Sequence, residues 1–235
     1  SMALKEEFEA DELEEVKERF FREAETAGRL NHPNIVTIYD AGEEHDLAYI
    51  AMEFLKGHDL ARYTKPDTLL PVPKVINIIH KSALALDYAH EFNIVHRDIK
   101  PANIMYNPDN SEVKITDFGI ARITDSSKTK TGTVLGTPTY MSPEQFRSEP
   151  VGAQSDQFSF CVALYEALHG QQPFGGTTLG SRCLNVIKGT IEPLPETQAK
   201  QVPMWLRLHV LRGLRTRRMR TPRWVSSAGT ESRPG

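Results

Sequence analysis

The spacing of apolar side chains predicts that helices make up much of the chain. Residues 6–30 carry apolar side chains at steps of three and four, the period of an amphipathic helix, which Pro33 must terminate. Residues 72–92 repeat the pattern, and the apolar segments 153–170 and 202–214 predict a central helix and a further one. The apolar positions of the first two helices are Leu13, Val16, Phe20, Ala24 and Ala27, and Val75, Ile79, Ala83, Leu86 and Ala89.

Other segments have the composition of strands. Residues 35–42 ("IVTIYDAG") and 48–54 ("AYIAMEF") are joined by a polar turn and predict an antiparallel pair. Residues 103–116 predict a small hairpin around "NPDNSE". Residues 119–140 are rich in Gly, Ser, Thr and Lys and predict a long loop, which is usually a functional feature in a compact domain.

Composition sets limits on the class of protein. The 39% hydrophobic and 25% charged residues are typical of a globular domain. No apolar run approaches the ~20 residues of a membrane helix, and no signal peptide is evident. Cys161 and Cys183 sit in apolar contexts without a C-x-x-C pattern, which predicts free buried thiols, with a disulfide as the alternative. Free thiols of this kind favour a reducing compartment.

The net charge of −3 conceals an asymmetry between the two parts of the chain. Residues 206–235 hold eight arginines and one acidic residue, whereas residues 1–205 hold 20 basic and 30 acidic residues. A basic tail can bind nucleic acid or acidic lipid. Apart from Trp224, this tail has no Phe, Tyr or Trp on which bases could stack, so nucleic acid is not an expected partner.

One segment holds five polar side chains between apolar ones. Residues 94–106 read "IVHRDIKPANIMY", "DFG" begins fourteen residues after Asn103, and "GTPTYMSPE" follows. In this order the motifs are the signature of protein kinases. The chain resembles the catalytic domain of bacterial, eukaryotic-like serine/threonine protein kinases over nearly its whole length.

The resemblance implies an α+β, bilobal fold with a truncated small β-rich lobe and a mainly helical large lobe. It also implies a cytoplasmic protein or a cytoplasmic domain of a larger signalling protein. Residues 1–55 correspond to part of the small lobe, residues 56–215 to the large lobe, and residues 216–235 to the basic tail. The partners it implies are ATP and a protein substrate with Ser or Thr hydroxyls.

The resemblance also assigns catalytic roles. Asp98 matches the residue that accepts the proton of the substrate hydroxyl, and Lys100 the residue that contacts the γ-phosphate. Asn103 and Asp117 match the ligands of Mg²⁺, or of Mn²⁺ in its place, because hard cations prefer oxygen ligands. Thr137 matches the threonine that packs against the Asp98–Lys100 pair. These residues would position ATP and stabilise charge during phosphoryl transfer.

The nucleotide pocket is assigned by the same resemblance. Met52 matches the gatekeeper, and Glu53 and Leu55 match hinge residues whose backbone groups bind adenine. Asp59 is placed to contact the ribose, and Met105 to form the floor under adenine.

Further positions match internal supports of the family fold. His96 and Phe118 match two members of a hydrophobic spine, with Ala27 and Ile38 as weaker candidates, and Asp156 matches the anchor of the catalytic loop. The apolar neighbours of the motif, Ile94, Val95, Ile104 and Met105, are expected to place this loop on strands.

Arg97, directly before Asp98, needs an anion as its partner, which predicts activation by phosphorylation of the long loop. The predicted acceptors are Thr129 and Thr131.

The chain also departs from the family pattern. The Gly-rich strand pair that covers the phosphates is absent. Glu23 matches the helix glutamate that pairs with a phosphate-gripping lysine, and Lys5, eighteen residues earlier, is the candidate lysine. Alternatively that lysine falls upstream of Ser1 and Lys5 is a solvent lysine. The missing strands would leave an exposed sheet edge, which a homodimer could cover.

The expected function is therefore ATP-dependent phosphorylation of protein Ser/Thr hydroxyls, with weak or no transfer by these residues alone. The alternative is a catalytically silent, kinase-like scaffold that still binds nucleotide.

Overall fold

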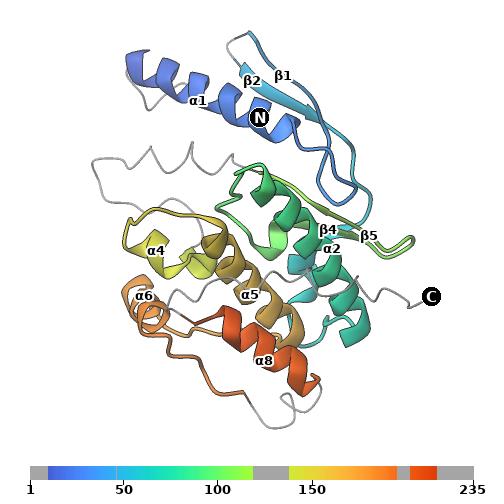
Figure 1. The fold of residues 1–235 in the computed structure, drawn as a ribbon, viewed down its shortest axis with the longest axis vertical. Coiled ribbons are helices and arrows are strands. Elements are labelled where there is room, and N and C mark those ends of the chain that lie inside the picture. The colour runs from blue at the N-terminus through green and yellow to red at the C-terminus, as the bar shows by residue number, and fades with distance from the viewer. Residues whose placement is uncertain (1–9, 46, 119–137, 195–201, 216–235) are drawn as a thin grey trace, which may run out of the picture.

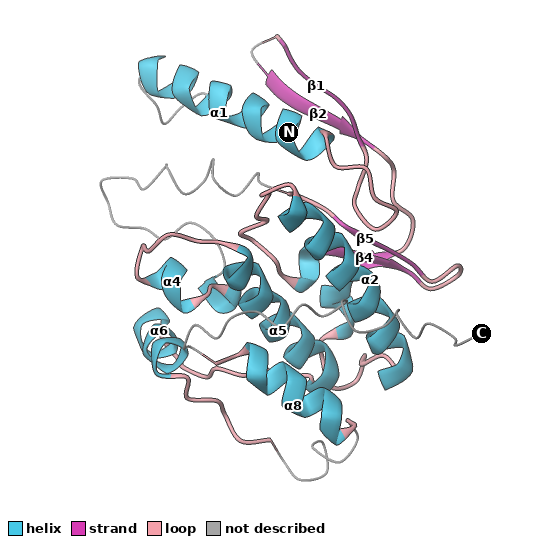
Figure 2. Cartoon of the chain, viewed as in Figure 1, coloured by secondary structure: helices cyan, strands magenta, loops and turns pink. Residues whose placement is uncertain are grey.

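The computed structural model describes residues 10–45, 47–118, 138–194 and 202–215. The described residues form two lobes (Figure 1): the upper lobe combines a helix with the β1–β2 sheet, and most helices lie in the lower lobe. The secondary structure in Figure 2 mixes helix and sheet, as expected for an α+β protein. The predicted bilobal architecture is confirmed.

The small lobe combines helix α1 (Ala10–Gly28) with strands β1 (Ile38–Glu44) and β2 (Leu47–Met52). The strands form an antiparallel pair, as predicted, with Ala41 opposite Ile50. The helix lies beside β1 and buries a row of small and apolar side chains at the predicted spacing, namely Val16, Ala24 and Ala27. The helix ends at Gly28, two residues before the predicted end.

A three-stranded sheet lies at the junction of the lobes. Its order is β3 (His58–Asp59), β4 (Ile104–Asn107) and β5 (Glu112–Ile115), and β4 with β5 is the predicted hairpin. Asp59 is opposite Met105, which is opposite Lys114. A parallel bridge between Ile35 and Ile115 attaches the segment before β1 to this sheet.

Helices build the large lobe. The long ones are α2 (Val72–Glu91) and the central α5 (Ala153–His169), both predicted. Helix α5 ends at Gly170, whose φ of 68° is a conformation that favours glycine. Helix α8 (Met204–Gly213) was predicted, whereas α6 (Leu179–Lys188) was not. The short elements are α4 (Pro143–Phe146) and the 3₁₀ helices η1 (Leu60–Tyr63), η2 (Pro101–Asn103) and η3 (Pro138–Tyr140).

The described residues form two apolar clusters, and the second of them joins the lobes. The larger one surrounds α5, where the rings of Phe158 and Phe174 stack with centroids 5.7 Å apart. The second joins α1 to the large lobe and includes Ala27, Ala85 and Phe118. Burial of apolar surface stabilises folding by about 25 cal/mol per Å². The second cluster therefore stabilises the packing of the small lobe against the large lobe.

Some details of the prediction were wrong. On α2, Ile79 and Ala83 are only half-buried, and Ile78, Ser82 and Ala85 are buried instead. Helix α2 has apolar side chains at many positions around its axis, so its apolar periodicity did not identify a single buried face. Cys183 is also only half-buried, although both cysteines are free thiols as predicted.

The predicted strand position of Ile94 and Val95 was wrong as well. Both residues lie in irregular backbone. The amides of His96 and Arg97, which follow them, donate to the Asp156 side chain rather than to a neighbouring strand. Ile104 and Met105 do lie in a strand, β4.

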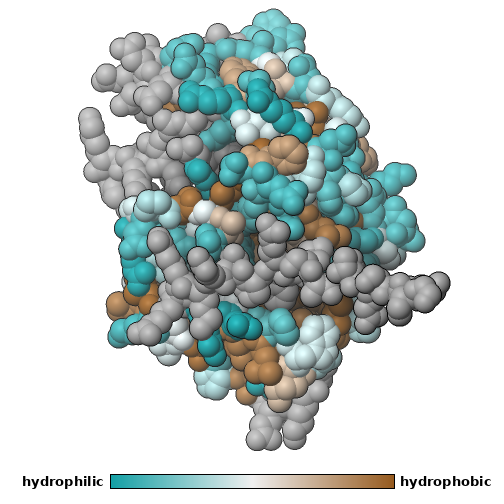
Figure 3. Space-filling model, in the orientation of Figure 1, coloured by the Kyte–Doolittle hydropathy of each residue, from teal (hydrophilic) through white to brown (hydrophobic). Residues whose placement is uncertain are grey.

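The surface is mostly polar over the small lobe on the face shown in Figure 3. Among the helices that the structure describes, each is too short or too polar to cross a membrane.

Candidate active site

The loop between α2 and β4 is anchored by a buried aspartate. Asp156 on α5 is 0% exposed, and its carboxylate accepts hydrogen bonds from the backbone N–H groups of His96 (2.8 Å) and Arg97 (2.7 Å). The same carboxylate lies 2.7 Å from Nε2 of His90 at the end of α2. Bonds to a charged acceptor are among the stronger hydrogen bonds in proteins. Asp156 thus anchors the loop, as expected; the sequence did not suggest His90.

Arg97 adopts a strained backbone conformation at the centre of this loop. Its φ is 71°, which is uncommon for a residue with a side chain. Asp156 holds its N–H, and Gln145 of α4 donates from Nε2 to its carbonyl at 2.8 Å. Such strain costs about 1–3 kcal/mol and persists where the surroundings enforce it. Here the enforcing contacts come from two separate helices.

Three of the predicted catalytic residues meet directly after this point. Nζ of Lys100 lies 2.6 Å from Oδ2 of Asp98, and both side chains are half-buried. The amide Nδ2 of Asn103 donates to the Asp98 carbonyl (2.9 Å) and approaches its Oδ2 (3.3 Å). The structure therefore gathers a carboxylate, an ammonium and an amide within hydrogen-bonding distance.

Asp117 reaches the same region from the end of β5. The N–H of Thr116 donates to the Asn103 carbonyl at 3.0 Å, which attaches this segment to the catalytic loop. Asp117 has a φ of 61°, so the chain turns sharply immediately before Phe118. The backbone of Thr116 thus attaches Asp117 to Asn103, the two residues that the sequence assigned to one metal site.

His96 connects the two segments and its tautomer follows from its partners. Nε2 lies 2.8 Å from the Thr116 carbonyl, which can only accept, so Nε2 carries the proton. Nδ1 then accepts from the Asp98 N–H at 3.3 Å. The ring also contacts Phe118, with centroids 4.6 Å apart. His96 therefore orders the backbone of Asp98 and Asp117 together.

The four residues predicted for the hydrophobic spine lie in or beside one apolar cluster. Phe118 is buried in the apolar cluster that also contains Ala27 of α1, and Ile38 of β1 packs against that cluster. The contact between His96 and Phe118 extends it to the catalytic loop. The spine thus links the two lobes through the site.

Most residues predicted to bind the nucleotide lie at the end of β2 or between β2 and β3, and Met105 lies in β4. Met52 ends β2 and is exposed, and Leu55 is half-buried. Met105 is half-buried in β4, opposite Asp59. The Asp59 carboxylate caps η1 by accepting from the N–H of Arg62 at 3.3 Å, so it also has a structural role that the sequence did not indicate.

Lys114 is a contact residue that sequence reasoning missed. Its Nζ lies 2.6 Å from Oε1 of Glu53, and that oxygen also accepts from the N–H of Thr37 at 2.8 Å. Burial raises the pKa of Glu53, but the bonds from Lys114 and Thr37 outweigh burial and leave this pKa below its ordinary value. The available signal was the position of Lys114 between two buried apolar residues, Val113 and Ile115.

The remaining predicted residues are less fully described. Glu23 lies on α1, one residue before the buried Ala24, and both of its carboxylate oxygens are shielded from solvent. Lys5, Thr129, Thr131 and Thr137 lie outside the residues that the structure describes.

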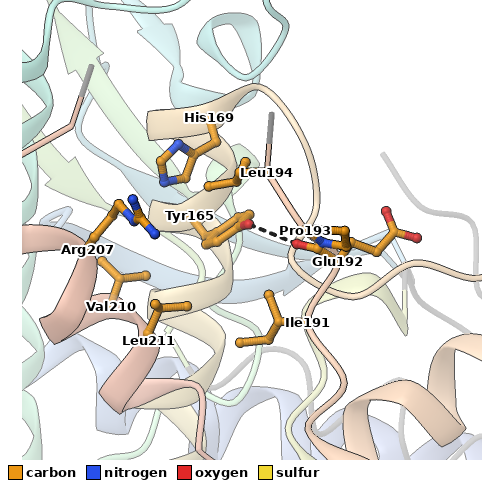
Figure 4. Close-up of a pocket in the computed structure, with 9 residues that line it drawn as sticks. All are labelled: Tyr165, His169, Ile191, Glu192, Pro193, Leu194, Arg207, Val210 and Leu211. Atoms are coloured by element: carbon orange, nitrogen blue, oxygen red, sulfur yellow. Dashed lines mark hydrogen bonds between the residues drawn. The ribbon is translucent and has the colours of Figure 1, made fainter. Parts of the chain in front are cut away.

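A separate pocket of about 400 Å³ lies between α5 and α8 (Figure 4). It contains none of the predicted site residues. Tyr165 donates to the Glu192 carbonyl at its rim, and the Glu192 carboxylate points away from Arg207. His169 lies in the wall of this pocket. Its pKa is lowered to about 4, mainly by burial and further by the positive charge of Arg207.

Comparisons with known proteins place these features in a family. The family model for the protein kinase domain matches residues 1–209. Serine/threonine-protein kinase PknB of Mycobacterium leprae is 44% identical over 186 residues, which cover 77% of this chain and 29% of that protein. PrkC of Bacillus subtilis is 43% identical over 167 residues, covering 71% of this chain and 26% of PrkC.

More distant matches agree. A probable serine/threonine-protein kinase of Clostridium acetobutylicum is 40% identical over 210 residues, covering 89% of this chain and 31% of that protein. The crystal structure of Rad53 1–466 in complex with AMP-PNP matches with a TM-score of 0.72 and 29% identity, covering 85% of this chain and 50% of that one. The chain thus spans less than a third of the length of these bacterial relatives. From its motifs, its fold and these matches, the chain belongs to the protein kinase domain family.

Proposed function

We propose that this kinase domain transfers the γ-phosphate of ATP to Ser or Thr hydroxyls of a protein substrate, with a low rate for these residues alone. The observation that carries the proposal is the contact between Asp98 and Lys100 at 2.6 Å, with Asn103 bonded to Asp98. The named serine/threonine kinases among the relatives and the AMP-PNP in the Rad53 structure support the choice of reaction and nucleotide.

The chemistry assigns each group a role. The substrate oxygen attacks the γ-phosphorus while the bond to the leaving ADP oxygen breaks, and Asp98 takes the hydroxyl proton. The Lys100 ammonium has three donors, and only one of them is needed for Asp98. The others are available to the transferring phosphoryl oxygens. Charge on those oxygens is thereby stabilised where it develops.

The donor set fits a magnesium ion. Nδ2 of Asn103 is used for Asp98, which leaves its Oδ1 as a hard oxygen ligand, and the Asp117 carboxylate would supply further oxygen ligands. Within the described ranges no three His, Cys, Asp or Glu side chains converge as a metal cage. That agrees with Mg²⁺, which keeps several waters and takes phosphate oxygens as further ligands. When bound, the ion would neutralise phosphate charge, and Mn²⁺ is suited to the same ligands.

The nucleotide is assigned to the segment between the lobes. Backbone groups of Glu53 and Leu55 would bind adenine between Met52 and Met105, with Asp59 toward the ribose. Glu23 and Lys5 would grip the α- and β-phosphates, and Thr137 would pack near Asp98. Phosphorylation of Thr129 and Thr131 would regulate the site through Arg97.

The test is phosphate transfer to a basic protein, measured with Mg-ATP for the wild-type chain and for Asp98→Asn. Because a positioned base contributes about 10²–10⁴-fold, the variant should lose about a thousandfold in rate while binding Mg-AMP-PNP as before. Equal rates in both proteins would refute the assignment of Asp98. A folded wild-type chain that binds nucleotide without transferring phosphate would instead support the silent scaffold.

A further inference from the structure

Lys114 is a buried lysine that the proposed chemistry does not use. The residue is 8% exposed, in β5 between Val113 and Ile115, which are fully buried. Burying an ammonium group costs free energy unless the charge is paired and hydrogen-bonded. Its partners therefore explain why the chain tolerates it there.

The partner is held at several points. Oε1 of Glu53 meets Nζ of Lys114 at 2.6 Å and the N–H of Thr37 at 2.8 Å. The backbone N–H of Glu53 donates in turn to the Thr37 carbonyl at 2.9 Å. Nζ of Lys114 also reaches the Ile35 carbonyl at 3.4 Å. Glu53 is thereby fixed through both its main chain and its side chain.

These contacts join three segments at the junction of the lobes. Glu53 follows β2, Thr37 precedes β1, and Lys114 lies in β5 of the large-lobe sheet. In that sheet Lys114 is opposite Met105, and residues directly opposite one another share a face. Lys114 thus stands beside the proposed adenine floor and reaches from it to the hinge. In Figure 1 the chain descends from β2 toward this sheet.

We propose that Lys114, acting through Glu53, is a positioning residue that sets the preference of the site for adenine over guanine. The inference deepens the proposed function and depends on nucleotide binding there. Adenine has an amino donor where guanine has a carbonyl acceptor. A Glu53 carbonyl held in place accepts from the amino group and repels the guanine oxygen. A peptide free to turn can present the N–H of Phe54 instead, and discrimination is lost.

The experiment compares the wild-type chain with Lys114→Met. Affinities for Mg-AMP-PNP and Mg-GMP-PNP are measured by calorimetry. A hydrogen bond that depends on a fixed carbonyl contributes about tenfold, so the affinity ratio should fall about tenfold, chiefly through weaker AMP-PNP binding. The matched control is Lys81→Met, which removes a half-buried lysine on α2 that donates to the Ser111 carbonyl. The control should keep the wild-type ratio, and an unchanged ratio in Lys114→Met overturns the proposal.

A double variant separates positioning from simple charge burial. Glu53→Gln with Lys114→Met removes both charges and keeps an acceptor for the Thr37 N–H. If Lys114 positions the hinge, the double variant shows the same reduced ratio. If the single variant fails only because a carboxylate is left buried without its counter-charge, the double variant recovers the wild-type ratio, and the proposal is wrong.

Hydrogen exchange in the nucleotide-free protein distinguishes failure of this inference from failure of the proposed function. Amides of residues 53–55 should exchange about tenfold faster in Lys114→Met, because a local restraint is lost, while those of His96 and Arg97 keep their rates. A wild-type chain that binds neither nucleotide contradicts the proposed function. Unchanged exchange at residues 53–55 overturns the role of Lys114 whatever the nucleotide results.

Discussion

The catalytic loop and the β1–β2 sheet are held in contrasting ways. The loop is fixed by polar contacts among buried groups, with Asp156, His96 and Asn103 all shielded from solvent. Among the residues that the structure describes, the sheet consists of two strands, and Tyr39 on it is 70% exposed. Removing one buried polar group leaves its partners without a hydrogen bond and lowers stability. Removing an exposed ring changes the stability little. The groups proposed for chemistry are therefore preorganised, and the nucleotide side depends on a few anchors such as Lys114.

Loss of the loop anchor should have the largest effect on stability. Asp156→Ala leaves two backbone donors and Nε2 of His90 without their acceptor. We expect the free energy of unfolding to fall by about 3 kcal/mol or more, measured by urea denaturation. Asp87→Ala, at an exposed position of α2, is the control and should change it by less than about 0.5 kcal/mol.

Should Asp156→Ala fail to fold, Asp156→Asn offers a milder change. It keeps one acceptor oxygen and removes the charge. Wild-type stability in this variant would show that the charge-assisted bonds do not anchor the loop.

Acid should weaken the large lobe through His169. The pKa of this residue is about 4 in the folded protein, below its ordinary value of 6.5, so the unfolded chain binds the proton more readily between these values. Its contribution to stability is complete above pH 6.5 and is lost as the pH falls toward 4. Urea midpoints at several pH values should show this decline, and His169→Gln should flatten it. A parallel decline in the variant would assign the effect to other groups.

The exposed sheet should show the smallest effect. Tyr39→Ser removes a ring that is mostly in solvent, so we expect the free energy of unfolding to change by less than about 0.5 kcal/mol. The homodimer suggested by the exposed edge can be examined with the same variant by sedimentation equilibrium. A wild-type dimer that dissociates in Tyr39→Ser would show that this face is covered in solution, and a larger stability loss would show that it is packed within the chain.

Much of the site could be predicted from one short motif. The spacing from Asp98 to Asn103 and Asp117 identified residues that the structure connects through Asp98 and Thr116. Local sequence was sufficient for Asp98, Lys100 and Asn103, because they lie close together along the chain. Asp156 lies 60 positions from His96, and it was predicted only because "SDQFSF" matches the family pattern.

Long-range partners could not be predicted in the same way. Lys114 and Glu53 are separated by 61 positions, and nothing near either residue indicates the other. Helix α6 was missed because it is short: its 10 residues offer few apolar positions, although Leu179, Cys183 and Val186 do recur at steps of four and three. The irregular backbone at Ile94 and Val95 is enforced by Asp156 on α5, which a strand-like local pattern cannot reveal.

The most direct test of the division between the two regions measures rate and affinity in two variants. Single-turnover transfer and AMP-PNP affinity are compared for Asp98→Asn and Lys114→Met. We predict that Asp98→Asn loses about a thousandfold in rate with unchanged affinity. Lys114→Met should keep its rate at saturating ATP and lose affinity. The opposite pattern, or equal losses of both quantities in both variants, would contradict the account.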